Sequence, residues 1–94
     1  MLPEASAVRD EHVWHLFVVR SRRRDELQAH LSRVGIQTMV HYPVPPHRQQ
    51  GYPDLSSCHL PLTEAIHDEV LSLPMSPVMT DAQMEEVAAA VNRW

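Results

Sequence analysis

The chain has 94 residues, of which 44% are hydrophobic and 21% are charged, and its formal net charge at pH 7 is -4. A chain of this length forms one domain with a modest core, and its negative charge argues against a nucleic-acid partner, which would require a basic surface. The sequence contains no apolar run of the roughly 18 residues that a membrane span needs, and its first residues lack the hydrophobic stretch of a signal peptide.

The cysteine and the basic residues indicate the compartment of the protein and the chemistry open to it. The single cysteine, Cys58, cannot form an internal disulfide, which fits a reducing compartment. All 8 basic residues are arginines, so the chain contains no lysine. We therefore expect a single domain over residues 1–94 in a cytoplasmic protein.

The first third of the chain predicts a strand, a helix and a second strand. Residues 12–20 are rich in valine and aromatic side chains on both alternating faces, which is typical of a strand covered on both sides. Residues 21–35 show helical spacing of apolar residues, with Ser21 as the expected N-cap and Gly35 at the end. Residues 36–41 then read as the second strand.

Residues 41–61, here called the proline loop, interrupt this pattern. The stretch "HYPVPPHRQQGYPDL" contains two histidines, two tyrosines and four prolines. Proline has a fixed φ and no N–H, so the stretch forms neither a helix nor a central strand. Loops of this length are uncommon and often functional.

The last third predicts a helix over residues 62–74, a short strand within residues 72–79 and a helix over residues 80–94. Thr80 and Gln83 have the spacing of a capping box for the last helix, whose apolar stripe is Met84, Val87, Ala88 and Val91. The order is β-α-β-loop-α-β-α. We therefore expect an α+β fold in which helices pack on a small sheet of about three strands.

The cysteine and histidine residues are the first candidates for enzyme chemistry. Cys58 beside His59 suggests a nucleophile and a base, but no third partner is evident, and an inert loop cysteine is the more common case. His12 and His15 point to opposite faces of a strand and cannot share a metal ion, and the chain lacks the paired ligand spacings of zinc sites. We predict no catalytic residue and no metal site.

The proline loop is the better candidate for a binding role. His41 and His47 offer imidazoles that titrate near neutral pH, and Tyr42 offers a hydroxyl on a rigid ring. Prolines hold such groups in place, which lowers the entropic cost of binding. These residues suit a polar small-molecule subsite, although a long connection packed on the surface would have the same composition.

Three blocks of the sequence resemble a known family: "VWHLFVVR", "GIQTMVHYPVPPH" and "VLSLPMSPVMTDAQ". Together they are similar to the C-terminal domain of the DegT/DnrJ/EryC1/StrS sugar aminotransferases, which use pyridoxal phosphate. The resemblance covers nearly the whole chain. It implies the small C-terminal domain of a fold-type I aminotransferase, part of a dimeric enzyme that moves an amino group onto a keto-sugar carried on a nucleotide.

The resemblance also implies roles for individual residues. The segment "HYPVPPH" would border the nucleotide-sugar side of the cleft, which makes His41, Tyr42 and His47 the expected substrate-binding residues. Pyridoxal phosphate requires a lysine for its Schiff base, and this chain has none. The cofactor would therefore be held by the large domain of the full-length enzyme, and this chain would bind none and would not catalyse transamination alone.

The sequence thus indicates the C-terminal part of a nucleotide-sugar aminotransferase, which contributes substrate-side residues and closes the cleft. The expected partners are the large aminotransferase domain or further copies of the chain. A stand-alone binding or interaction module, or an inactive remnant, are the alternatives. A strand that is apolar on both sides also predicts an uncovered apolar surface around Trp14, Leu16 or Phe17, together with the proline loop.

Overall fold

The structure is a computed structural model that describes residues 1–4 and 13–94. Along these residues the elements are strand β1 (Phe17–Arg20), helix α1 (Arg24–Arg33), two short 3-10 helices (Pro46–Arg48 and Pro53–Leu55), helix α2 (Pro61–Glu69), strand β2 (Val70–Leu73) and helix α3 (Asp81–Asn92). The predicted α+β fold class is confirmed. None of the described helices is long and apolar enough to cross a membrane.

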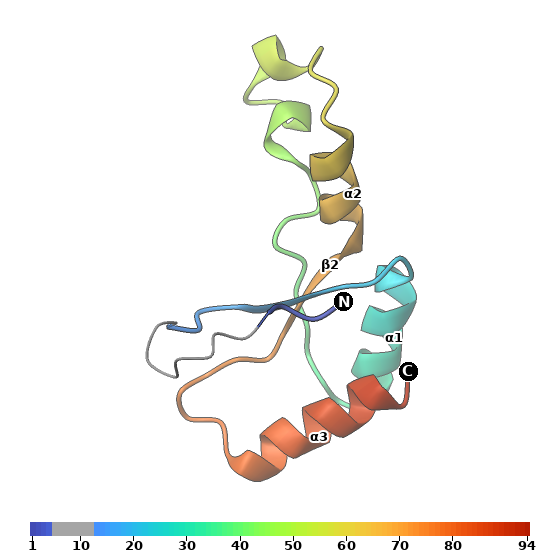
Figure 1. Cartoon of the computed structure of the whole chain (residues 1–94), viewed down its shortest axis with the longest axis vertical. Coiled ribbons are helices and arrows are strands. Elements are labelled where there is room, and N and C mark those ends of the chain that lie inside the picture. The colour runs from blue at the N-terminus through green and yellow to red at the C-terminus, as the bar shows by residue number, and fades with distance from the viewer. Residues whose placement is uncertain (5–12) are drawn as a thin grey trace.

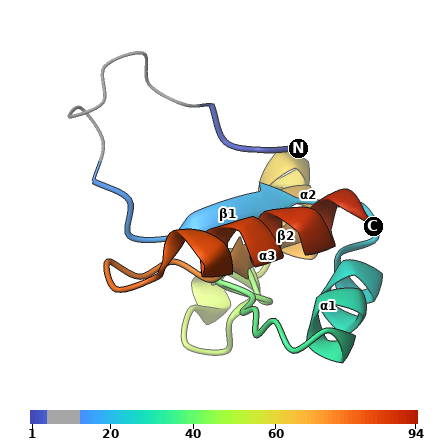
Figure 2. The same cartoon turned by 90° about the horizontal axis from the view of Figure 1, so that it is seen from below.

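The molecule consists of a body and an arm (Figure 1). The body contains the two strands with α1 and α3, and the arm consists of the proline loop and α2, which run side by side away from the body. Figure 2 shows α3 crossing over the two strands, with α1 beside them. Because α2 leads directly into β2, the arm is joined to the centre of the sheet.

The sheet is smaller than predicted. β1 pairs antiparallel with β2, and Phe17 lies opposite Leu73. The expected strand over residues 36–41 is reduced to one bridge, in which Met39 and Ser72 exchange two backbone hydrogen bonds of 3.1 and 2.7 Å. The reason is local: the Ile36 amide bonds to the Leu31 carbonyl at the end of α1, so this segment reaches the sheet only at Met39.

The boundary between α2 and β2 also corrects the sequence prediction. The helix expected over residues 62–74 ends at Glu69, and the strand expected within residues 72–79 begins earlier, at Val70. All four residues of β2 are buried. A short, fully buried apolar run has no periodicity that separates a strand from a helix, which explains the error.

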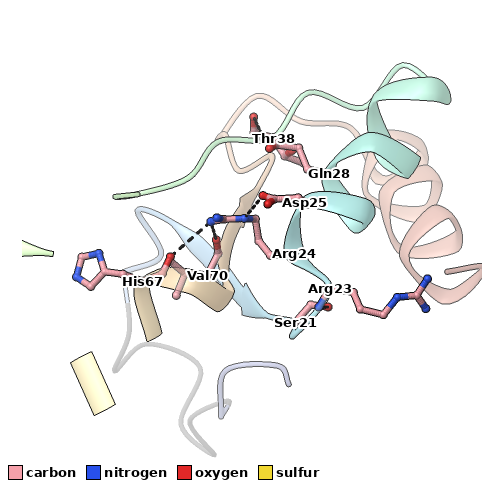
Figure 3. Close-up of polar contacts among 8 residues, drawn as sticks. All are labelled: Ser21, Arg23, Arg24, Asp25, Gln28, Thr38, His67 and Val70. Atoms are coloured by element: carbon pink, nitrogen blue, oxygen red, sulfur yellow. Dashed lines mark hydrogen bonds and ion pairs between the residues drawn. The ribbon is translucent and has the colours of Figure 1, made fainter. Parts of the chain in front are cut away.

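Arginines from the body fix this boundary. The Arg24 guanidinium donates to the carbonyls of His67 and Val70 at 3.5 and 3.3 Å, as Figure 3 shows. A cation at a helix C-terminus is favoured by the unpaired carbonyls and the helix dipole. Arg20 donates twice to one carboxylate oxygen of Glu69, at 3.0 and 2.7 Å, and the Ser21 amide donates to the Glu69 carbonyl. The end of α2 is therefore held by side chains of β1 and α1.

The beginning of the chain differs in detail from the prediction. β1 starts at Phe17 rather than at residue 12, which itself lies outside the described residues. Ser21 does not cap α1: the N-cap residue is Arg23, whose amide donates to the Ser21 hydroxyl at 3.1 Å. Gly35 has a φ of 84°, which confirms the left-handed residue that ends α1.

The core lies between the strands, α1 and α3. Leu31 and Leu71 are fully buried at its centre, and they are joined by Val19, Leu27, Ile36, Leu73 and Ala90. The capping box of Thr80 and Gln83 is confirmed at the start of α3. The stripe predicted on α3 is only partly in the core: Val87 and Val91 pack against it, whereas the buried residue of the helix is Ala90, which was not predicted. All four stripe residues, Met84, Val87, Ala88 and Val91, line an apolar groove of about 390 Å³.

We predict that Leu71→Ala lowers the free energy of unfolding by about 2–5 kcal/mol, because it removes a fully buried side chain and leaves a cavity. The matched control is Val78→Ala, at a side chain that is 84% exposed. Urea unfolding followed by circular dichroism measures both. Equal losses for the two variants would show that Leu71 does not lie at the centre of the core.

Candidate functional site

A hollow in the body borders the base of the arm. It has a volume of about 670 Å³ and is open to solvent. Its walls come from α1, from residues 36–41, and from β2 with the residues that follow it; the lining residues are Leu16, Gln28, Ser32, Ile36, Gln37, Thr38, Met39, His41, Ser72, Leu73, Pro74 and Met75. Six of these twelve residues are apolar, and the other six carry amide, hydroxyl or imidazole groups, so the hollow offers both apolar contact and hydrogen-bonding groups to a small molecule.

His41 is the one predicted site residue that lines this hollow. Its Nδ1 forms a hydrogen bond of 2.8 Å with the hydroxyl of Ser72, which is buried in β2. The contact fixes the ring to the central strand. Among the described residues no hydrogen bond is recorded for Nε2, so this nitrogen is available for a ligand.

Tyr42 lies next to the hollow, on its arm side. The peptide bond between His41 and Tyr42 is cis, and the two rings meet edge to face with their centroids 5.4 Å apart. The Tyr42 carbonyl accepts a hydrogen bond of 2.6 Å from Nδ1 of His67 on α2, and the Tyr42 side chain is 64% exposed. Its backbone is held while its ring faces solvent.

His47 lies in a different environment from His41 and Tyr42. Its side chain is only 3% exposed, and its Nε2 donates to a carboxylate oxygen of Glu64 on α2 at 2.9 Å. Its buried Nδ1 has no hydrogen-bond partner among the described residues. His47 therefore packs the proline loop against α2 and does not line the hollow.

Glu64 is the charged centre of the arm. The oxygen that contacts His47 also accepts from the Arg48 guanidinium at 3.1 Å and from the Leu60 amide at 3.4 Å. These donors favour the charged carboxylate, and the hydrogen bonds from His47 first and Arg48 second lower the pKa of Glu64 from 4.5 to about 2. Glu64 therefore stays ionised over the ordinary pH range and ties the loop to the helix.

The structure brings His41 and Tyr42 together and adds three residues that sequence reasoning missed. Ser72 orients His41, while His67 and Glu64 hold the loop. One signal was present for Ser72, a lone polar residue in the run "VLSL". Glu64 and His67 are three residues apart on α2, a spacing that places both on one helix face, but nothing in the sequence said that this face meets the loop.

The other chemical candidates gain no support from the geometry. Cys58 is half-buried and free, and His59 is exposed, without a recorded contact between them in the described chain. Within residues 1–4 and 13–94 no group of three or more potential ligands is arranged to hold a metal ion. His12 lies outside these residues.

The predicted uncovered apolar surface is present only in part. Leu16 is 38% exposed at the hollow, whereas Trp14 and Phe17 are half-buried with their ring centroids 5.4 Å apart. Phe17 also lines the apolar groove beside α3. The proline loop also exposes large apolar side chains, at Tyr42, Val44, Tyr52 and Leu55.

Comparison with known proteins identifies the class to which the fold belongs. The chain is 44% identical to the S. venezuelae DesV seen crystallographically in complex with a ketimine intermediate, with a TM-score of 0.79 over 86% of this chain and 22% of that one. It superposes with a TM-score of 0.81 on NtdA from Bacillus subtilis with bound cofactor PMP, at 34% identity over 98% of this chain and 22% of that one. Both are much longer chains.

The model of the DegT/DnrJ/EryC1/StrS aminotransferase family matches residues 1–92, and the chain belongs to this family. A dTDP-3-amino-3,6-dideoxy-alpha-D-galactopyranose transaminase from Aneurinibacillus thermoaerophilus is 51% identical over 83 residues, which are 88% of this chain and 23% of that protein. A UDP-N-acetyl-3-dehydro-alpha-D-glucosamine 3-aminotransferase from Acidithiobacillus ferrooxidans is 35% identical over 98% of this chain and 25% of that protein. The chain thus spans about a quarter of the length of these relatives.

We predict a characteristic pH dependence for the Glu64 contact. Because the pKa of Glu64 is lowered to about 2 in the folded chain, its contribution to stability is fully present above 4.5 and is lost as the pH falls toward 2. The difference in unfolding free energy between the wild type and Glu64→Gln should therefore be constant above 4.5 and shrink below it.

Urea unfolding across this pH range measures the difference, and the NMR shift of the Glu64 carboxyl carbon reads the titration directly. Glu26→Gln is the matched control, because Glu26 also pairs with an arginine, Arg23, but on an exposed helix face. A Glu64 carboxyl that titrates near 4.5 would contradict the contacts described above.

Proposed function

We propose that the chain is the C-terminal part of a pyridoxal-phosphate-dependent aminotransferase that aminates a keto-sugar carried on a nucleotide. Its contribution is one wall of the substrate cleft. The observation that carries this proposal is the pair His41 and Tyr42, held at the rim of a hollow in a chain of this family. The names of the dTDP- and UDP-sugar transaminases among the relatives support the substrate class.

The cofactor does not fit this chain alone. Pyridoxal phosphate supplies an electron sink for amino-group transfer, and it is anchored through a lysine amine. Because the chain has no lysine, the anchoring residue must belong to the rest of the enzyme. The proposed role of this chain is therefore to bind and orient substrate and to exclude water, without a catalytic residue of its own.

The residues at the hollow suit a polar ligand. His41 offers Nε2, because its Nδ1 is occupied by Ser72. Tyr42 offers its hydroxyl from an exposed ring. We keep His47 as the third substrate-side residue, acting through the loop that it packs against α2 rather than by lining the hollow.

The proposed partner is the remaining three-quarters of the enzyme, in a cytoplasmic dimer. The apolar groove beside α3 and the exposed Leu16 are surfaces that such a larger protein would cover. A second candidate function is a stand-alone nucleotide-sugar binding module, which is favoured by the fact that this chain supplies the lining of the hollow without help from another. Transferase activity in the presence of the rest of the enzyme would favour the first function over the stand-alone module.

A chimera tests the proposal. Residues 1–94 should replace the matching quarter of the Aneurinibacillus thermoaerophilus transaminase, to which the chain is 51% identical. We predict that the chimera retains transaminase activity. His41→Ala in the chimera should reduce kcat/KM by about tenfold or more, since a hydrogen bond to a charged group contributes about 1.5–3 kcal/mol.

The matched control in the chimera is His59→Ala, at an exposed histidine of the same loop. Circular dichroism and thermal melting establish that each protein is folded. A folded chimera without activity, or equal kinetics for the His41 and His59 variants, would contradict the proposal.

A further inference from the structure

Two side chains of α2 contact the proline loop at several points between its two ends. His67 bonds to the Tyr42 carbonyl at the start of the loop, and Glu64 bonds to His47 and Arg48 in its middle and to the Leu60 amide at its end. Within residues 1–4 and 13–94, neither side chain bonds to the body. The face of α2 that carries these two side chains therefore bonds to the proline loop.

His67 is also one of the residues through which the arm is attached to the body. Its carbonyl accepts from Arg24 of α1, whose side chain is 13% exposed, while its ring points away from Arg24 (Figure 3). One residue thus links α1 to the loop: its backbone is tied to the body and its imidazole is tied to Tyr42.

The residues 41 and 42 are consequently held from two sides. His41 is bound to Ser72 of the central strand, and the Tyr42 backbone is bound to His67 of the arm. A ring that is 64% exposed on a backbone held in this way is preorganised for contact, because little conformational freedom remains to be lost on binding.

We propose that His67 is a positioning residue for the hollow: it fixes Tyr42 relative to His41 through the Tyr42 carbonyl, and Glu64 holds the remainder of the loop in the same conformation. The part of this proposal that concerns ligand binding rests on the function proposed above. The part that concerns the loop stands on the contacts alone.

Three variants separate a positioning role from general packing. His67→Phe keeps a ring but removes the nitrogen that donates to Tyr42. His67→Asn places an amide nitrogen near the position of Nδ1 and should restore the contact. His59→Phe makes the same change at an exposed histidine of the loop and is the control.

Amide hydrogen exchange of the 94-residue chain is the first measurement. The loop contains hydrogen-bonded amides at Arg48, Gln49, Tyr52, Leu55 and Cys58, and the Ser72 amide in the core serves as the reference. We expect the Arg48 and Gln49 amides to exchange about tenfold faster in His67→Phe, with Ser72 unchanged and with wild-type rates in His67→Asn and His59→Phe. Glu64→Gln, measured in the same way, should loosen the same amides by an independent route.

Titration with dTDP-glucose and with UDP-N-acetylglucosamine, followed by NMR, is the second measurement. The dissociation constant of the probe that binds should rise about fivefold to tenfold in His67→Phe and should recover in His67→Asn. Unchanged loop exchange in His67→Phe would overturn the positioning role, and so would equal acceleration of loop and core amides. A wild-type chain that binds neither probe would count against the proposed function and leave the exchange result to decide the inference.

Discussion

The pairing of β2 on both of its edges is the constraint on which the rest of the structure depends. β1 pairs with one edge, and the backbone of Met39 pairs with the other through Ser72. All four β2 residues are buried, so their backbone groups must find partners within the protein. A two-stranded sheet alone would be marginal, and the bridge at Met39 together with α1 and α3 gives it cover.

This constraint also determines where the candidate site forms. Ser72 bonds through its backbone to Met39 and through its hydroxyl to His41, so one residue of the central strand fixes both the wall of the hollow and the ring that borders it. α2 continues directly into the same strand, and Arg20 and Arg24 clamp the junction. The direction of the arm, and with it the position of Tyr42, follows from the sheet.

Much of this arrangement could be predicted from the sequence, because it is encoded locally. The capping box of Thr80 and the left-handed Gly35 are signals read within a few residues. The boundary at Val70 could not be read in this way, because tertiary contacts with Arg20 and Arg24 decide where the helix ends. The prediction of a strand over residues 36–41 was wrong for a similar reason, because the backbone of this segment is bonded first to α1, through Ile36.

The site shows the same division between local and distant information. The loop residues His41 and Tyr42 are recognisable by composition and by resemblance to the family, and the structure places them together beside the hollow. The same reasoning gave His47 an equivalent role, yet the structure buries it against Glu64. That difference depends on how the loop folds back on α2, over contacts 17 residues apart in the sequence.

The central claim is that the hollow bordered by His41 is the part of this chain that meets a nucleotide-sugar. The most direct measurement is a chemical-shift map of the 94-residue chain titrated with dTDP-glucose. The account predicts saturable shifts at Gln37, His41, Tyr42 and Met75, with the amides of α3 unaffected. Shifts confined to the apolar groove beside α3, or no saturable shift at any residue, would contradict it.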